Sequence, residues 1–415
     1  MKHRIIEIGK DVLIGLLLCS LFVLVVLALP ETIVRSVSPL RWTAQKLGVL
    51  EADDDFVPQQ TAVSAASPIV ISLNGSAGRT SFCADSAVLD TLYTQFSGML
   101  GKALSTAEGE NAVSEKTLLT LAAGESLYFR YRGSIPVASV AEWLGAESCP
   151  LQGMTGGFLL TAENDRVRLT VLGTPCTVCD TRLSAELLRS ELNAFPPDGS
   201  AFAFETENSP FAPLTVLPGG DLTVPAAEAE NPYSQEVLLA VAAALECNPY
   251  GTGAYTDVSG NAVFSEAGRT CTVSPDGRVV LTAADDSYAA FRASDESPEA
   301  RTRTANSVLQ SICGSCPGDA RLELESYTED GETAELHFRY LLNGVPVFPR
   351  DAVVTFRGAQ LASLTVTLRT YHLLTETCTL LPIAQTAAIA ENGSSLCPGY
   401  IDSGAGRLAV GWTTR

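Results

Sequence analysis

The chain has 415 residues, of which 46% are apolar and 18% are charged, and its formal net charge is −20. This length allows two or three domains that each bury a core, and the apolar content is too high for a disordered chain. Basic residues are concentrated near the start, where residues 1–50 hold six Lys/Arg against three Asp/Glu. The remainder carries a charge of −23, which repels phosphate backbones and makes nucleic acid a poor partner.

An uncharged apolar run near the N-terminus, Val12–Leu29, predicts a transmembrane helix. Its eighteen residues cover roughly 27 Å at the rise of an α-helix, which is enough to span the hydrocarbon core. Three basic residues precede the run: Lys2, Arg4 and Lys10. By the positive-inside rule, residues 1–11 are expected in the cytoplasm and the bulk of the chain on the outer side.

A cleavable signal peptide is the alternative to an anchor, because it shares the basic start. Its apolar region is usually shorter and ends in a small-x-small cleavage site, which Ala28-Leu29-Pro30 fits badly. We therefore expect the helix to be retained. Within it, Gly15 and Cys19 stand four residues apart, a spacing of small residues that permits close helix approach in lipid. From the sequence alone, chance placement of two small residues in an apolar run is the favoured explanation.

Changes in composition and periodicity divide the exported part. Residues 51–68 combine acids, glutamines, serines and two prolines, as a solvated linker does, so the triplet Asp53–Asp55 is read as linker and not as a metal site. We expect a cytoplasmic tail at 1–11, the transmembrane helix at 12–29, a juxtamembrane stalk and linker at 30–68, and extracytoplasmic α+β domains at 69–215, 216–296 and 297–415.

Hydrophobic periodicity predicts helices packed on antiparallel sheets. Helical spacing occurs at 85–104, 184–195, 234–246, 298–313 and 382–392. Strand-like segments occur at 125–132, 156–162, 166–173, 262–265, 270–274, 278–282, 320–328, 331–343, 353–358 and 360–371, and again near residues 400 and 409–412. Pro275-Asp276-Gly277 is a strong turn signal. Because helices are segregated from strands, the class is α+β and not a doubly wound parallel sheet.

Side chains suited to catalysis are scarce. The chain has three histidines, and His3 belongs to the predicted cytoplasmic tail. In the strand around His337, alternation places Glu335 and Arg339 on the same face as the imidazole, opposite an apolar face, so a solvated strand surface is favoured over catalysis. Neither HExxH, GxSxG nor a glycine-rich phosphate loop occurs. We expect no catalytic residue, no cofactor and no metal ion.

Two CxxC pairs, Cys176–Cys179 and Cys313–Cys316, resemble half-sites for zinc or thiol redox chemistry. They are far apart and fall in different predicted domains, whereas a four-thiolate zinc site keeps its pairs within one small module. Redox use needs the first cysteine at a helix N-terminus, and Cys313 is expected to end a helix. Structural disulfides or buried thiols are the simplest interpretation for the ten cysteines outside the apolar run, and their pairing stays open.

Several motifs of the second half follow one another in a family-like order. They are Asn248-Pro249-Tyr250, Tyr255, Gly260–Phe264 with Glu266, the turn Val273–Gly277, Phe338-Arg339-Tyr340, Asn343–Val347, and the closing segment from Tyr400 to Trp412. With the basic tail, one spanning helix and the α+β portion, the chain resembles the YycH/YycI family of bacterial two-component regulatory proteins.

The resemblance implies a non-enzymatic regulator, anchored in the bacterial cell membrane, that associates with a WalK-type sensor histidine kinase. It implies contact through the transmembrane helix, on the face formed by Gly15, Cys19, Phe22 and Val26. The expected partners are membrane lipid and the kinase, and pairing with a paralogous regulator stays open. An extracytoplasmic enzyme or a cell-envelope module that binds peptide or glycan is the alternative, and thiol-redox activity is a third reading.

Overall fold

The computed structural model describes residues 64–415 apart from Glu147, Pro317, Ala405 and Arg415. The predicted tail, spanning helix and most of the linker therefore lie outside the described residues. The described residues belong to one compact unit. Its helices and large antiparallel sheets confirm the α+β class.

The described residues form seven α-helices, and capping side chains explain where several begin. Four predicted helices are confirmed to within a few residues, and Asp85, Ser184, Ser234 and Ser297 each accept a hydrogen bond from a backbone N–H of the first turn. The predicted helix at 382–392 is shorter, and α5 and α6 lack a predicted counterpart. The helices are α4 (Ser86–Ser105), α5 (Glu115–Ala123), α6 (Val137–Trp143), α7 (Ala185–Leu192), α8 (Gln235–Ala244), α9 (Pro298–Cys313) and α10 (Ile383–Ala387).

The first sheet has the order β2-β1-β4-β5-β6-β7-β3, with all neighbours antiparallel. Helix α4 packs on one face, where Tyr93 meets Phe129 edge to face, and Phe202 meets Tyr128 on the other. Both faces are thus buried. The strands are β1 (Val70–Gly75), β2 (Gly78–Cys83), β3 (Glu108–Ala112), β4 (Ser126–Pro136), β5 (Met154–Glu163), β6 (Arg166–Val171) and β7 (Thr177–Ser184).

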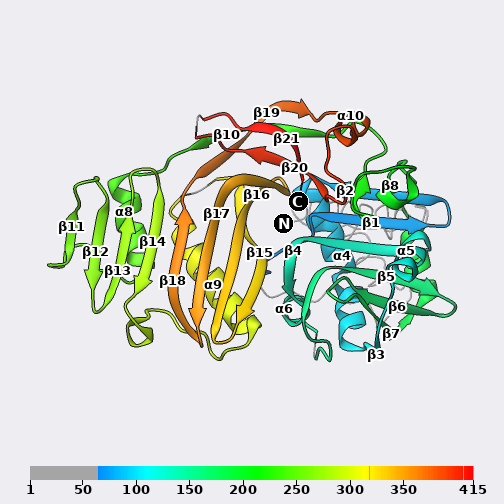
Figure 1. Ribbon diagram of the computed structural model, residues 1–415, viewed down its shortest axis with the longest axis horizontal. Coiled ribbons are helices and arrows are strands. Elements are labelled where there is room, and N and C mark those ends of the chain that lie inside the picture. Colours follow the sequence, from blue (N-terminus) through cyan, green and yellow to red (C-terminus); the bar gives the residue numbers. More distant parts are fainter. Residues whose placement is uncertain (1–63, 147, 317, 405, 415) are drawn as a thin grey trace, which may run out of the picture. The chain divides into compact units, whose positions relative to one another are not determined.

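The second sheet runs β11-β12-β13-β14-β18-β17-β16-β15, and α8 and α9 lie against it (Figure 1). The meander β15–β18 returns so that β18 pairs with β14. The predicted segments 216–296 and 297–415 therefore both contribute strands to this one sheet. These strands are β11 (Ala254–Thr256), β12 (Ala262–Glu266), β13 (Arg269–Val273), β14 (Arg278–Ala283), β15 (Ala320–Asp330), β16 (Thr333–Leu342), β17 (Val345–Arg357) and β18 (Gln360–Thr367).

Most of the remaining strands lie across the upper end of the second sheet in Figure 1. They are β10 (Thr223–Glu230), β19 (Thr370–Thr379), β20 (Leu396–Ile401) and β21 (Ala409–Thr414). A separate short pair consists of β8 (Ala201–Phe202) and β9 (Val216–Leu217), and Figure 1 shows β8 beside the first sheet. Strand β10 pairs with β19, and β20 runs parallel to β17. Short 3₁₀ turns occur at Ala203–Glu205 and Asp286–Tyr288.

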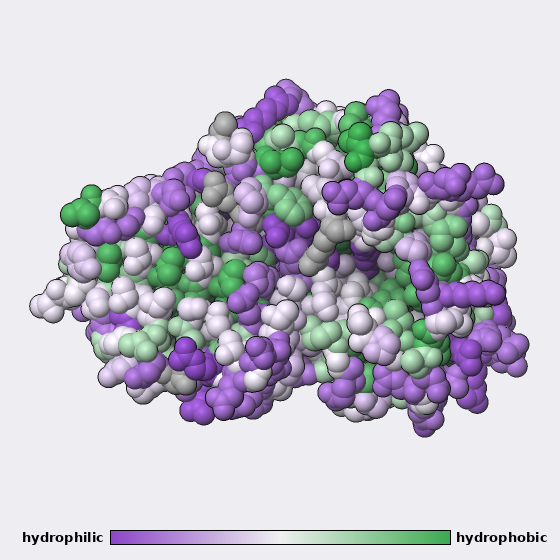
Figure 2. All heavy atoms as spheres, in the orientation of Figure 1, coloured by the Kyte–Doolittle hydropathy of each residue, from purple (hydrophilic) through white to green (hydrophobic). Residues whose placement is uncertain are grey.

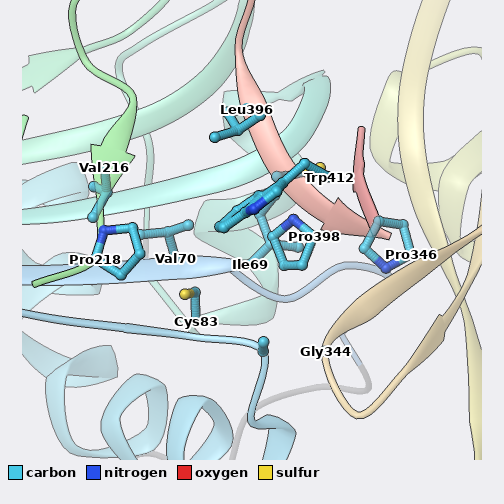
Figure 3. A pocket seen from close by; sticks show the side chains of 12 residues that line it. Ile69, Val70, Cys83, Val216, Pro218, Gly344, Pro346, Leu396, Pro398 and Trp412 are labelled. Carbon is cyan, nitrogen blue, oxygen red and sulfur yellow. The ribbon is translucent and has the colours of Figure 1, made fainter. Parts of the chain in front are cut away.

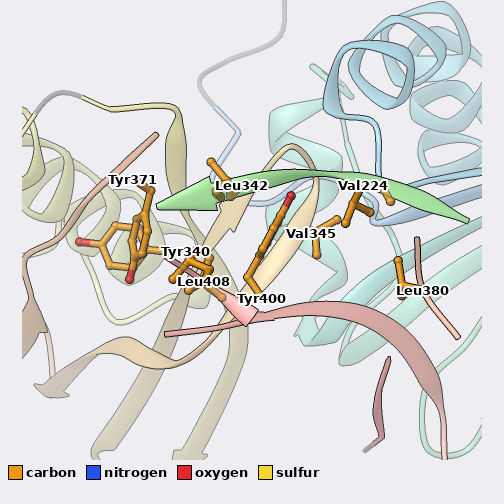
Figure 4. Close-up of a cluster of buried hydrophobic side chains, with 11 residues drawn as sticks. Val224, Tyr340, Leu342, Val345, Tyr371, Leu380, Tyr400 and Leu408 are labelled. Atoms are coloured by element: carbon orange, nitrogen blue, oxygen red, sulfur yellow. The ribbon is translucent and has the colours of Figure 1, made fainter. Parts of the chain in front are cut away.

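A shared apolar cluster holds these strands together (Figure 4). Tyr340 and Tyr371 pack edge to face with ring centroids 5.3 Å apart, and the buried Tyr400 hydroxyl donates to the Pro225 carbonyl at 2.7 Å. Buried tyrosines with satisfied hydroxyls add apolar contact without the cost of an unpaired polar group. The cluster consists of Ala84, Val224, Ala227, Tyr340, Leu342, Val345, Val347, Tyr371, Leu380, Tyr400 and Leu408.

Candidate functional site: a charged seam between the two sheets

Charged side chains gather where β15 of the second sheet faces β4 and α4 of the first. Successive residues of a strand point to opposite faces, so Arg321 and Glu323 share one face of β15. The pairing with β16 shifts register between Leu324 and Ser326, at Glu325. Arg321 makes a two-pronged ion pair with Asp90 of α4 at 2.9 and 3.3 Å. We call this set of contacts the seam.

Glu325 is the centre of the seam. Its carboxylate pairs with Arg132 of β4 at 3.0 Å and with Arg339 of β16 at 2.7 Å. Both guanidinium groups lie 4.6 Å from the centroid of the Phe348 ring, and the side chains of Arg132 and Glu325 are each only 8% exposed. One carboxylate thus links two arginines from different sheets in a water-poor setting, where such contacts are strong and costly to break.

Glu323 lies two residues before Glu325 on β15 and is also buried. The Ser67 backbone N–H donates to its carboxylate at 2.8 Å, and Arg321 lies 3.5 Å away. Burial raises the pKa of Glu323 above its ordinary value of 4.5, Arg321 and Ser67 oppose that shift, and Asp90 adds to it. Groups with such shifts concentrate at functional sites, although structural networks also produce them.

Replacing Glu323 by glutamine is expected to weaken the pH dependence of stability. Because the folded-state pKa lies above 4.5, the folded protein binds this proton more tightly than the unfolded chain does. The stabilisation is fully present below pH 4.5 and is lost as pH rises through the folded pKa. At neutral pH, Glu323→Gln is therefore expected to unfold at an equal or higher urea concentration than the wild type.

Urea midpoints of the full-length protein, measured at several pH values, check this expectation. Glu376→Gln is the matched control, since that carboxylate pairs with Arg407 at the surface. The raised pKa of Glu323 is contradicted if Glu323→Gln keeps the wild-type dependence of the urea midpoint on pH. It is also contradicted if this variant is clearly less stable than the wild type at neutral pH.

The last residues of the predicted linker are not solvated, as the sequence suggested, but enter the folded unit through the seam. The Ala65 carbonyl accepts from the Leu324 N–H of β15 at 2.6 Å, and the Ile69 N–H donates to the Arg130 carbonyl of β4 at 2.8 Å. Ala65 and Ala66 are buried. Residues 64–69, which we call the entry segment, therefore contact both sheets before continuing into β1.

A hairpin makes a second connection between the sheets. Asn343 and Gly344 both have positive φ angles, 52° and 75°, as a two-residue hairpin turn between β16 and β17 requires. The Asn343 side chain accepts from the Ser86 N–H at 3.2 Å and donates to the Ala84 carbonyl at 3.0 Å, at the start of α4. The turn thus fixes the position of the second sheet against the first helix.

A polar groove of about 310 Å³ lies beside the entry segment, between α6 and α9. Glu142 and Arg303 form an ion pair across it. This volume suits a small ligand, and amide, hydroxyl and charged groups suit a polar one. Its lining comprises Ala65, Glu142, Trp143, Arg303, Asn306, Ser307 and Gln310.

A second, apolar cavity has room for little more than one water, at about 20 Å³ (Figure 3). Cys83 and Cys397 both line it, with Pro346 and Trp412. Burial, followed by repulsion from Cys397, raises the pKa of the Cys83 thiol to about 11. A thiol in that state is a poor nucleophile, so this cavity is a packing feature of the C-terminal strands.

Several of the exposed apolar side chains in the described part of the chain lie in two groups. Tyr250, Tyr255 and Val258 are exposed near the edge strand β11. Leu381 and Ile389 are exposed near α10, where Figure 2 shows apolar spheres gathered at the top of the view. Exposed aromatic and aliphatic groups of this kind are typical of surfaces that contact other proteins.

The histidines and CxxC cysteines that the sequence analysis considered for catalysis or redox chemistry lie at separate places in the structure. His337 pairs with Glu335 on β16, and His372 lies opposite Glu228 across β10 and β19. Cys313 ends α9, as predicted, and its thiol contacts the Tyr340 hydroxyl at 3.7 Å. Cys176 immediately precedes β7, and Cys179 lies within that strand. Neither Cys176 nor Cys313, the first cysteines of the two pairs, occupies a helix N-terminus.

The ten cysteines between residues 64 and 415 are free thiols in the structure. Within the same described range, His, Cys, Asp and Glu side chains form no group of three suited to a metal ion. The predicted partner-contact residues Gly15, Cys19, Phe22 and Val26 lie outside that range. No helix inside it is both long and apolar enough to cross a membrane.

Sequence reasoning did not find the seam. The alternation in Arg321–Glu325 and Leu336–Tyr340 indicates strands with one polar face, and polar faces usually contact water. Two arginines near two glutamates on the neighbouring strands β15 and β16 were the available signal, but this signal gave no indication that another sheet covers them. Comparison with protein-family models, curated proteins and solved structures finds no match to this chain.

Proposed function

We propose that this protein is a non-enzymatic, membrane-anchored regulator of a two-component system, which modulates a WalK-type sensor histidine kinase through transmembrane and extracytoplasmic contacts. The observation that carries the proposal is the entry segment. Within the described residues, the segment nearest to the predicted anchor is bound to the seam through Ala65 and Ser67.

This connection supports a coupling role. A displacement of the anchor that moves Ala65 or Ser67 changes contacts to β15, and β15 belongs to the same network as Arg132 and Arg339. Packed, ion-paired interfaces respond to such displacements by shifting between discrete arrangements. The exposed tyrosines near β11 supply a surface for the extracytoplasmic contact.

Adding bulk to the predicted helix face tests the proposal. Gly15→Leu is expected to reduce co-purification of the kinase from membranes at least about tenfold, because helix association in lipid depends on close packing at small residues. The matched control is Leu24→Phe, which adds bulk on the opposite face of the predicted helix. Kinase autophosphorylation in the same membranes gives the signalling readout.

Two results together contradict the regulator role. One is the failure to recover any sensor kinase with the wild-type chain. The other is unchanged signalling after residues 12–29 are replaced by an unrelated spanning helix.

The polar groove favours a second candidate function, a cell-envelope module that binds or processes peptide or glycan. Its 310 Å³ and its Glu142–Arg303 pair suit a small polar ligand. Isothermal titration of the full-length protein with cell-wall peptide and glycan fragments tests it. This candidate is favoured if a fragment binds the wild type and the surface control Arg407→Gln but does not bind Arg303→Gln. If no fragment gives a heat of binding with the wild type, the candidate function is wrong.

A further inference from the structure

The turn that follows α8 places a cysteine over the second sheet. The Glu246 N–H donates to the Ala243 carbonyl at 3.1 Å, and the Cys247 N–H donates to the Ala242 carbonyl at 2.8 Å. This pair of bonds, with φ of 54° at Glu246, is a Schellman motif, in which a left-handed residue ends the helix. The direction of the chain at Cys247 is thereby fixed.

Contacts to the sheet hold this turn on both sides of Cys247. The Arg269 guanidinium of β13 donates to the Glu246 carbonyl, and the Asn248 N–H donates to the Glu266 carboxylate of β12 at 3.2 Å. Between these two contacts, the Cys247 thiol donates to the Leu245 carbonyl at 3.5 Å and lies close enough to the Cys271 thiol of β13 for each to shift the pKa of the other. The two sulfurs are thus brought together by a helix end and a central strand that are each independently fixed.

The surroundings give the two thiols different roles. Cys271 is fully buried between Phe264 and Leu281 of the neighbouring strands, and its interaction with Cys247 and its burial both raise its pKa. The interaction with Cys271 lowers the pKa of Cys247, burial opposes that shift, and the Arg269 guanidinium adds to it. Cys247 is therefore the better nucleophile of the pair.

We propose that Cys247 and Cys271 are a disulfide-forming pair that locks the end of α8 onto β13 when the protein meets a disulfide oxidant. The Cys247 thiolate attacks one sulfur of the oxidant, whose other sulfur leaves as a thiolate. Cys271 then loses its proton and attacks the Cys247 sulfur, releasing the second oxidant thiolate. The two protein thiols lose two electrons, and their protons end on the two thiols of the reduced oxidant.

Because both thiols are buried, an oxidant can reach them only during folding or when the turn that follows α8 opens. The bond closes the segment 247–271, which contains the exposed Tyr250, Tyr255 and Val258. Oxidation therefore restricts the part of the sheet edge that carries these side chains. This inference does not depend on the proposed signalling function.

Peptide mapping of the full-length protein in detergent tests the pair. The protein is refolded in a glutathione buffer containing both oxidised and reduced forms, alkylated and digested without reduction. The expected product is a cross-linked peptide joining Cys247 to Cys271, lighter by two hydrogens than the sum of its halves. Cys271→Ser is expected to abolish it, and the control Cys83→Ser to retain it.

Thermal unfolding gives a second measurement. Oxidised wild type is expected to melt about 3 °C above the reduced protein, and the double variant Cys247→Ser/Cys271→Ser is expected to lose that difference. Recovery of both cysteines in alkylated form from oxidised, folded wild type overturns the proposal. Linkage of either one to a different cysteine also overturns it.

Discussion

Replacing Glu325 by glutamine is expected to lower the free energy of unfolding by about 3–5 kcal/mol, because a buried ion pair that loses one partner leaves an uncompensated charge. Here the substitution removes an ion-pair partner from two arginines at once. Arg132 and Arg339 both lie against the Phe348 ring, and Glu325 is the carboxylate that pairs with each of them. Without it, two like charges remain close together between the sheets.

The measurement is urea unfolding of the full-length protein at neutral pH, followed by circular dichroism. Glu335→Gln is the matched control, since Glu335 lies on the adjacent strand with its side chain 47% exposed beside His337. That variant is expected to change stability by less than about 0.5 kcal/mol.

A double-mutant cycle separates the charge effect from a general packing loss. Arg132→Met is expected to cost clearly less in the Glu325→Gln background than in the wild type, because the neutral background has already lost the pair. Additive costs, or an effect of Glu325→Gln no larger than that of Glu335→Gln, would show that the seam does not hold the two sheets together.

Replacing Gly157 by alanine is expected to destabilise the first sheet by about 3 kcal/mol, near the upper end of overpacking costs. Gly157 is a buried residue of β5, paired with Arg130 of β4. A Cβ atom there would lie 2.2 Å from the Phe129 carbonyl oxygen. Since that oxygen belongs to the backbone of the adjacent strand, the two strands must separate to make room.

The preceding residue provides a control with the same substitution. A Cβ atom on Gly156 would meet the Leu172 carbonyl oxygen at 3.7 Å, an ordinary contact. Gly156→Ala is therefore expected to leave the thermal midpoint nearly unchanged. Equal midpoints for the two variants would mean that β4 and β5 do not approach as closely as the structure describes.

Local sequence signals were sufficient for most secondary structure. The prediction for 298–313 coincides with α9, because Ser297 caps it, Pro298 suits its first turn and Gly314 follows it. The turn at Pro275-Asp276-Gly277 is also confirmed, with φ of 88° at Gly277 and its N–H bonded to the Ser274 carbonyl. These features depend on neighbours within a few residues.

Helices α5 and α6 escaped prediction because they are short and their burial depends on distant partners. In α5 only Leu118 and Ala122 are buried, and they pack against Tyr128 and Phe202. The predicted domain boundary at residue 296 also rested on local sequence signals alone. Nothing near that position indicates that β18 returns to pair with β14 across it.

The seam shows most clearly which features could be predicted from the sequence and which depend on tertiary structure. The alternation around His337 fixed which residues form the apolar face, and Leu336, Phe338 and Tyr340 are indeed buried. The predicted solvated face is correct for Glu335 and His337, which are partly exposed, and wrong for Arg339, whose side chain is 13% exposed.

By itself, the sequence determined the α+β class, most element positions and an apolar run long enough to span a membrane, because each follows from periodicity and nearby residues. What covers a polar strand face depends on residues far along the chain. Only the tertiary structure could bring Arg132 to Glu325, Ser67 to Glu323 and Cys247 to Cys271.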